Sequence, residues 1–275
     1  MSKGKISVFY DHLLQAAQQT GKSIEEMLRF AKECGIDAVE IRHETLWESR
    51  TLFSKIKESG LKVSCIYEFY DMNEKIHPDA MQKQINTAFT TYTDRLLVVP
   101  GLFKGMDAIR FSLVRKNYAK LSAFMDKNAA VQEAVEALTL MAASAAKNEI
   151  IVTVEDFDHK KSPLCCINGV RYFLEHVPGL KYTLDTGNFA YIGEDVLDAF
   201  EVLQEHIAHV HCKDRGEKLK SVATGGGKLP MAEIVRKLQE KGYDGYYAIE
   251  HFDMENQEEA IKCSAEFLRG VLNEA

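Results

Sequence analysis

The sequence predicts an α/β fold, a single (β/α)8 TIM barrel that spans residues 1–275. Eight short apolar runs rich in β-branched and aromatic residues alternate with longer stretches of helical pattern, which is typical of parallel sheets built from βαβ units. Eight units in 275 residues average about 34 residues each, close to what such a barrel requires. No GxGxxG follows the first run and no Pro/Gly/Ser-rich linker divides the chain. A doubly wound sheet and a two-domain chain therefore explain the pattern less well.

The eight predicted strands share apolar, β-branched character and differ mainly in how each one ends. They are ISVFY from Ile6, AVEIRH from Ala38, LKVSCIYEF from Leu61, RLLVVPG from Arg95, EIIVTVEDF from Glu149, LKYTLDTGN from Leu180, IAHVHCKD from Ile207 and GYYAIEHF from Gly245. A helical stretch follows each run, as βαβ units require.

Cap residues mark several of the predicted helices. Ser23 precedes IEEMLRFAKEC with acidic residues in its first turn, and Gly35 follows its end. Gly60 closes a stretch that begins at Trp47, and the tail from 255 to 272 reads as a terminal helix. The region 111–147 contains no strand-like run and predicts one helix broken near Asn128, or two helices.

Composition excludes several classes of protein. The 34 basic and 41 acidic residues give a net charge of −7, which argues against a nucleic-acid partner. The six cysteines are scattered, with no CxxC, so neither a disulfide framework nor a zinc ribbon is expected. There is no apolar run of signal-peptide or membrane-spanning length, and no Asn-x-Ser/Thr acceptor. These features predict a cytoplasmic protein with no membrane partner and reduced thiols.

Polar side chains end the last four predicted strands. Glu155, Asp185, His211 and Glu250 follow one another at intervals of 30, 26 and 39 residues, about one βα unit each. In a barrel, the carboxyl ends of all strands face one mouth, so these side chains are expected to converge there.

Three carboxylates and one imidazole form an oxygen-rich donor set. Such a set suits one divalent ion, with Mn²⁺ the first choice, Mg²⁺ or Co²⁺ close behind, and Zn²⁺ an alternative that favours more N and S ligands. Each residue could instead cap a helix or pair with a base such as Lys213 or Arg215. Converging carboxylates repel one another unless a cation or a proton separates them, which favours the metal site.

From VTVEDF to AIEHF the chain resembles the xylose isomerase-like TIM barrels, the sugar phosphate isomerase/epimerase superfamily. The motifs that carry the resemblance are Glu155 on the fifth strand, DTGN at Asp185, HVHCKD at His211, the loop GGGKLP, and AIEH at Glu250. The resemblance covers most of the chain and is strongest in its second half. It implies that Glu155, Asp185, His211 and Glu250 bind one divalent metal, and that Glu155 and Glu250 also exchange protons with the substrate. It also implies a homo-oligomer, a dimer or a tetramer.

Four further residues are candidate substrate contacts. Asn188 stands where many relatives carry histidine and suits a substrate hydroxyl better than a transition metal. His209 shares the strand parity of His211 and should point inward, as a supporting or core histidine rather than a ligand. Lys213 is a candidate for an anion or hydroxyl at the rim, and Glu68 lies near the end of the third strand. GGGK lacks the GxxxxGK[ST] spacing of a phosphate loop.

The function that follows is a metal-dependent isomerase or epimerase of a sugar or sugar derivative. Proton transfer between Glu155 and Glu250 would proceed through a metal-stabilised enediolate. The first alternative function is an inosose dehydratase-like lyase. The second is a sugar-binding barrel without catalytic activity. The histidine missing at Asn188 and the acidic charge argue against an abasic-site nuclease of the endonuclease IV branch.

Overall fold

The computed structural model describes residues 4–49, 51–74 and 78–274. Its main strands follow the order β1-β10-β7-β6-β5-β4-β3-β2 and close into a barrel, as the sequence predicts. Within these ranges, no helix is long and apolar enough to cross a membrane. All six cysteines are free thiols.

Each barrel strand lies within one of the eight predicted runs or overlaps it closely. The strands are β1 (Lys5–Phe9), β2 (Ala38–Arg42), β3 (Lys62–Phe69), β4 (Arg95–Val99), β5 (Ile151–Glu155), β6 (Lys181–Asp185), β7 (Ile207–Cys212) and β10 (Tyr246–Ile249). Most of their residues are buried, because a parallel strand is covered on both faces and therefore reads as a near-continuous apolar run.

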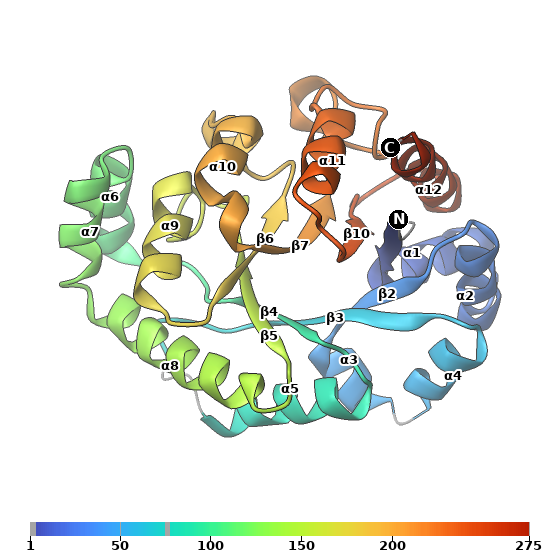
Figure 1. Cartoon of the computed structure of the whole chain (residues 1–275), viewed down its shortest axis with the longest axis horizontal. Helices are drawn as coiled ribbons and strands as arrows, with labels where there is room; N and C mark the ends of the chain where they lie inside the picture. The colour runs from blue at the N-terminus through green and yellow to red at the C-terminus, as the bar shows by residue number, and fades with distance from the viewer. Residues whose placement is uncertain (1–3, 50, 75–77, 275) are drawn as a thin grey trace. The chain divides into compact units, whose positions relative to one another are not determined.

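The chain divides into two compact units, and the first comprises Met1–Ile66 and His209–Ala275. In this unit β1 pairs in parallel with β2 and β10, with Ser7 opposite Ala38 and Lys5 opposite Tyr246. The helices α1 (Tyr10–Thr20) and α12 (Gln257–Asn273) pack beside these strands, and α2 (Ile24–Glu33) packs against α1 (Figure 1). Ser23 and Glu26 form a complete capping box at the start of α2, as the sequence predicts.

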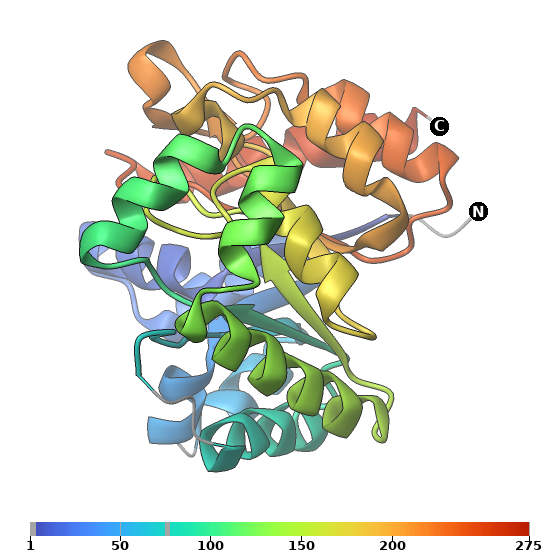
Figure 2. The ribbon, with the colours of Figure 1, turned by 90° about the vertical axis from the view of Figure 1, so that its left-hand side faces the viewer.

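The second unit comprises Tyr67–Ala208. In it β5 pairs in parallel with β4 and β6, with Arg95 opposite Ile151 and Thr153 opposite Lys181. The helices α5 (Pro78–Thr90) and α8 (Ala129–Ala146) lie side by side (Figure 1), as do α6 (Gly105–Val114) and α7 (Tyr118–Met125) (Figure 2). The expectation of a single domain stays a prediction.

The remaining elements connect the strands and helices named above. They are α3 (His43–Glu48), α4 (Leu52–Glu58), α9 (Ile167–His176), α10 (Val196–Leu203), α11 (Met231–Glu240), the 3-10 turns η1 (Phe189–Ile192), η2 (Gln204–His206) and η3 (Glu217–Leu219), and the two-residue strands β8 (Asp214–Arg215) and β9 (Ser221–Val222).

Two helical regions differ from the prediction. In the region 111–147 the predicted break near Asn128 is confirmed, but the region holds the end of α6 as well as α7 and α8, because Asn117 and Asn128 each cap a new helix by accepting a backbone N–H. The stretch from Trp47 to Gly60 spans the end of α3 and all of α4 rather than one helix, and Arg50 lies outside the described residues. The antiparallel pair β8–β9 was not expected from the sequence.

Candidate functional site

Glu40 and two histidines meet on one face of the first unit. His209 and His211 alternate with Val210 and Cys212 along β7, so both imidazoles point to the same side. Glu40 on β2 faces them: its Oε2 lies 2.7 Å from Nε2 of His209, and its Oε1 lies 3.1 Å from Nε2 of His211. All three side chains are buried. His209 and His211 therefore lie on the same side of β7, and the role of His209 stays a prediction.

Glu250 and Lys213 extend this face. His211 pairs with Ala248 across β7 and β10, which directs Glu250, two residues later, to the side of His211. Nδ1 of His211 lies 3.0 Å from Oε2 of Glu250, and Nζ of Lys213 lies 2.5 Å from Oε1. Lys213 was expected at a rim, but it is buried in an ion pair with Glu250.

These contacts shift two pKa values in the same direction. Burial opposes the charged form of Glu40, but His211 and His209 outweigh it and lower the pKa of Glu40 to about 2. Burial also acts against Glu250, yet Lys213 and His211 hold the pKa of Glu250 well below its usual range. Both carboxyl groups are therefore ionised at neutral pH.

Glu155 and Asp185 share a face in the second unit. The hydroxyl of Thr183 on β6 donates to the hydroxyl of Thr153 on β5 at 2.8 Å, so these two side chains point to one side. Glu155 and Asp185 each follow two residues later and point the same way. Both are buried. Oδ1 of Asp185 accepts the backbone N–H groups of Gly187 and Asn188, each at 2.8 Å, which fixes the orientation of the carboxylate.

Asp156 supports this pair from the next position along the chain. Its Oδ1 accepts the hydroxyl of Tyr182 at 2.5 Å and the backbone N–H of Asp185 at 2.9 Å. Among the described residues, its Oδ2 has no hydrogen-bond partner. Burial and the neighbouring Asp185 raise the pKa of Asp156 well above its usual range, which favours the uncharged form of this carboxyl beside Asp185.

Replacing Asp156 by asparagine should raise the stability of the metal-free protein at pH 7. The pKa of Asp156 is raised in the folded state above its ordinary value of 3.8, so the unfolded state releases this proton at lower pH and the free energy of unfolding falls as pH rises between the two pKa values. Asparagine preserves the acceptor oxygen and does not titrate. Urea denaturation should show that Asp156→Asn has a higher free energy of unfolding than the wild type. The difference should be small near pH 3.8 and grow by roughly 1.4 kcal/mol per pH unit above it. A gain that does not depend on pH would contradict a raised pKa for Asp156.

Asn188 and Glu68 occupy different settings. Asn188 is buried, and its amide donates to the backbone oxygen of Asp156 at 2.7 Å. Glu68 is half-buried near the end of β3, where its Oε1 accepts the backbone N–H of Phe69 at 2.9 Å. Their roles as substrate contacts stay predictions.

Asp214 organises the glycine-rich loop. Its carboxylate accepts four backbone N–H groups at 2.8 to 3.2 Å, those of Arg215, Gly225, Gly227 and Leu229. A Cβ at Gly227 would lie 2.2 Å from Oδ1 of Asp214, so only glycine fits there. The loop thus turns its N–H groups toward a carboxylate, which agrees with the prediction that GGGK is not a phosphate loop.

Asp214→Asn should destabilise the protein. An amide offers one oxygen in place of two and turns its NH₂ group toward backbone N–H donors. Each buried donor left without an acceptor costs about 1–3 kcal/mol. Urea denaturation should therefore show a lower free energy of unfolding for Asp214→Asn than for the exposed control Asp244→Asn. An equal stability for the two variants would show that the carboxylate does not hold the loop.

Some buried polar residues of the site are not predicted from the sequence. Glu40, Asp156, His12 and His251 are not among the residues that the sequence predicts for the site. The rings of His12 and His251 stack with centroids 5.0 Å apart, and Nε2 of His12 accepts the backbone N–H of His251 at 2.9 Å. The available signal was a charged or imidazole side chain at the end of an apolar strand, a pattern that Glu40 and Asp156 both fit.

Two groups of buried side chains carry the donor atoms that divalent ions use. One is Glu155, Asp185, His211 and Glu250, and the other is Glu40, Cys65 and His209. A family model described as xylose isomerase-like TIM barrel matches residues 28–271. The chain belongs to this family. This confirms the resemblance seen in the sequence.

Several solved structures resemble the chain along nearly its whole length. A probable 3-DHS dehydratase from Bacillus anthracis has a TM-score of 0.72 at 18% identity, covering 96% of this chain and 98% of its own. A sugar phosphate isomerase/epimerase from Parabacteroides distasonis has a TM-score of 0.71 at 15% identity, and the match covers 98% of this chain and 94% of that protein. D-psicose 3-epimerase from Clostridium cellulolyticum has a TM-score of 0.72 at 14% identity, and the match covers 98% of this chain and 99% of that protein. At these identities the likeness shows the fold. The search of curated proteins found no match.

Proposed function

We propose that the protein is a divalent-metal-dependent isomerase or epimerase of a sugar or sugar derivative. The observation that carries the proposal is the placement of three buried carboxylates and one imidazole at the ends of β5, β6, β7 and β10, which are successive neighbours in the strand order. Family membership and neighbours that include sugar epimerases support it.

The donor chemistry fits a divalent ion. Glu155, Asp185, His211 and Glu250 would hold it, since buried carboxylates require a counter-charge and oxygen donors with one imidazole suit Mn²⁺, Mg²⁺ or Co²⁺. When bound, the ion would supply a Lewis acid for a substrate carbonyl oxygen. Mn²⁺ is the first choice because it accepts both oxygen and imidazole ligands.

The two glutamates would move the protons. One carboxylate removes the proton from the carbon next to the carbonyl, and the other returns a proton to the opposite face of that carbon or to the neighbouring carbon. Lys213 and His211 hold the pKa of Glu250 well below its usual range, so this carboxyl is in the ionised form that a base requires. We assign Lys213 a second task, contact with a substrate oxygen, with Asn188 and Glu68 as further substrate contacts. The buried His209, bonded to Glu40, fits a supporting role.

Product analysis separates this function from its alternative. The protein with Mn²⁺ is incubated with ketoses, their phosphates and inososes, and the products are examined by NMR and mass spectrometry. An isomer of unchanged mass is expected. Loss of water would favour the dehydratase, the function named for the Bacillus anthracis neighbour. Binding of a sugar without any turnover would favour a barrel that has lost catalysis.

A further inference from the structure

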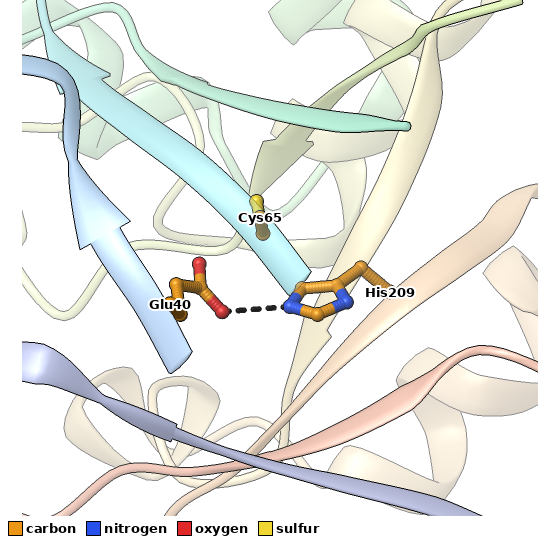
Figure 3. Close-up of side chains that lie close together, drawn as sticks. All are labelled: Glu40, Cys65 and His209. Carbon is orange, nitrogen blue, oxygen red and sulfur yellow. Dashed lines mark hydrogen bonds and ion pairs between the residues drawn. The ribbon is translucent and has the colours of Figure 1, made fainter. Parts of the chain in front are cut away.

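Glu40 makes two hydrogen bonds that the proposed reaction does not by itself require. Each of its oxygens takes the Nε2 atom of a different histidine, at 2.7 Å for His209 and 3.1 Å for His211. The carboxylate is fully buried and comes from β2, whereas both rings come from β7 (Figure 3 shows the shorter contact). The rings stand edge to face, with centroids 5.4 Å apart. One carboxyl group thus contacts two imidazoles at once.

The donor and acceptor roles in this arrangement are constrained. A carboxylate has acceptors only, whereas a ring nitrogen either carries hydrogen or presents a lone pair. Two contacts to one carboxylate therefore require hydrogen on Nε2 of both rings. In His211 the other nitrogen, Nδ1, faces Glu250 at 3.0 Å. With Nε2 committed to Glu40, Nδ1 is the nitrogen of His211 that can serve as a ligand.

We propose that Glu40 is a positioning residue that keeps hydrogen on Nε2 of both His209 and His211 and so reserves Nδ1 of His211 for the metal. The part that concerns the metal rests on the proposed function. Carboxylates that accept from the distal nitrogen of a histidine ligand commonly fix its ring orientation, and their loss lowers metal affinity by about 10- to 100-fold.

A second metal bound by Glu40, Cys65 and His209 is the competing interpretation. Their donor atoms lie within 4.8 Å of one another, and a thiolate with an imidazole and a carboxylate suits Zn²⁺. Such an ion would have to replace the 2.7 Å hydrogen bond between Glu40 and His209 (Figure 3). The hydrogen-bonded arrangement already uses both oxygens of Glu40, which favours the positioning role.

Ring nitrogen NMR on the metal-free, ¹⁵N-labelled protein tests the proposal directly. In the wild type, Nε2 of both rings should be protonated. In Glu40→Gln the single amide oxygen accepts from only one ring, and the NH₂ group demands a lone pair from the other, so one ring should lose its Nε2 hydrogen. A wild-type ring without hydrogen on Nε2, or two unchanged rings in Glu40→Gln, would overturn the proposal.

Titration calorimetry with Mn²⁺ and Zn²⁺ provides the second readout. Glu40→Gln should bind Mn²⁺ about 10- to 100-fold more weakly than the wild type. The control Glu44→Gln, which makes the same change at an exposed ion pair with Arg42, should bind it equally well. Unchanged affinity in Glu40→Gln, or a second Zn²⁺ equivalent that Cys65→Ser removes, would overturn the positioning role. If the wild type binds no Mn²⁺ while both rings keep their Nε2 hydrogens, the metal-dependent function fails and the hydrogen-bond assignment stands.

Discussion

Replacing Glu155 by glutamine is expected to lower kcat by about 10²- to 10⁴-fold, because glutamine preserves the shape of the side chain but cannot accept or return a proton. Glu250→Gln should have an effect of the same order. Turnover of the substrate identified by product analysis gives the measurement, and circular dichroism checks the fold. Glu133→Gln, an exposed change on α8, is the matched control and should leave kcat unchanged.

Glu250→Gln needs one further control because Glu250 pairs with the buried Lys213. Removing one partner of a buried ion pair costs about 3–5 kcal/mol, so that variant can lose activity by unfolding. The double variant Glu250→Gln with Lys213→Met removes both charges and should recover stability without recovering turnover. Full turnover in Glu155→Gln and in the double variant would show that neither glutamate transfers a proton.

A divalent ion is expected to stabilise the protein strongly. A ligand that binds only the folded state at 100 times its Kd adds about 2.7 kcal/mol to the free energy of unfolding. Mn²⁺ should therefore raise Tm in the wild type, and chelation should reverse the shift. In Asp185→Ala combined with His211→Ala, which removes two of the four expected ligands, the shift should vanish and metal analysis should find less than one equivalent. Stoichiometric metal in that variant would place the ion elsewhere.

The barrel could be predicted because its strands carry a local signal. A parallel strand covered on both faces must be apolar throughout, so each of the eight runs is visible without knowledge of its neighbours. The polar residues at the strand ends also carry a local signal, because a charged or imidazole group at the end of an apolar run stands out in the sequence. These residues are Glu155, Asp185, His211 and Glu250.

Some features could not be predicted because they depend on contacts between residues far apart in the sequence. Others could not be predicted because the elements are too short to show a pattern. Glu40 bonds to His209 across 169 residues of sequence, so nothing beside Glu40 in the chain indicates its partner. Asp156 reads as a second acid after Glu155, and only its burial beside Asp185 raises its pKa. The pair β8–β9 consists of two-residue strands, too short for an alternating pattern, beside a loop held by Asp214.

The origin of the transferred hydrogen tests the central claim most directly. The reaction is run in D₂O with Mn²⁺, and the product is examined by NMR and mass spectrometry. If two glutamates remove and return protons, the product should carry one deuterium from solvent at the reacting carbon, and Glu155→Gln should abolish both product and label. A product formed at full rate without deuterium would contradict the account, because the hydrogen would then have moved without exchange through either carboxylate.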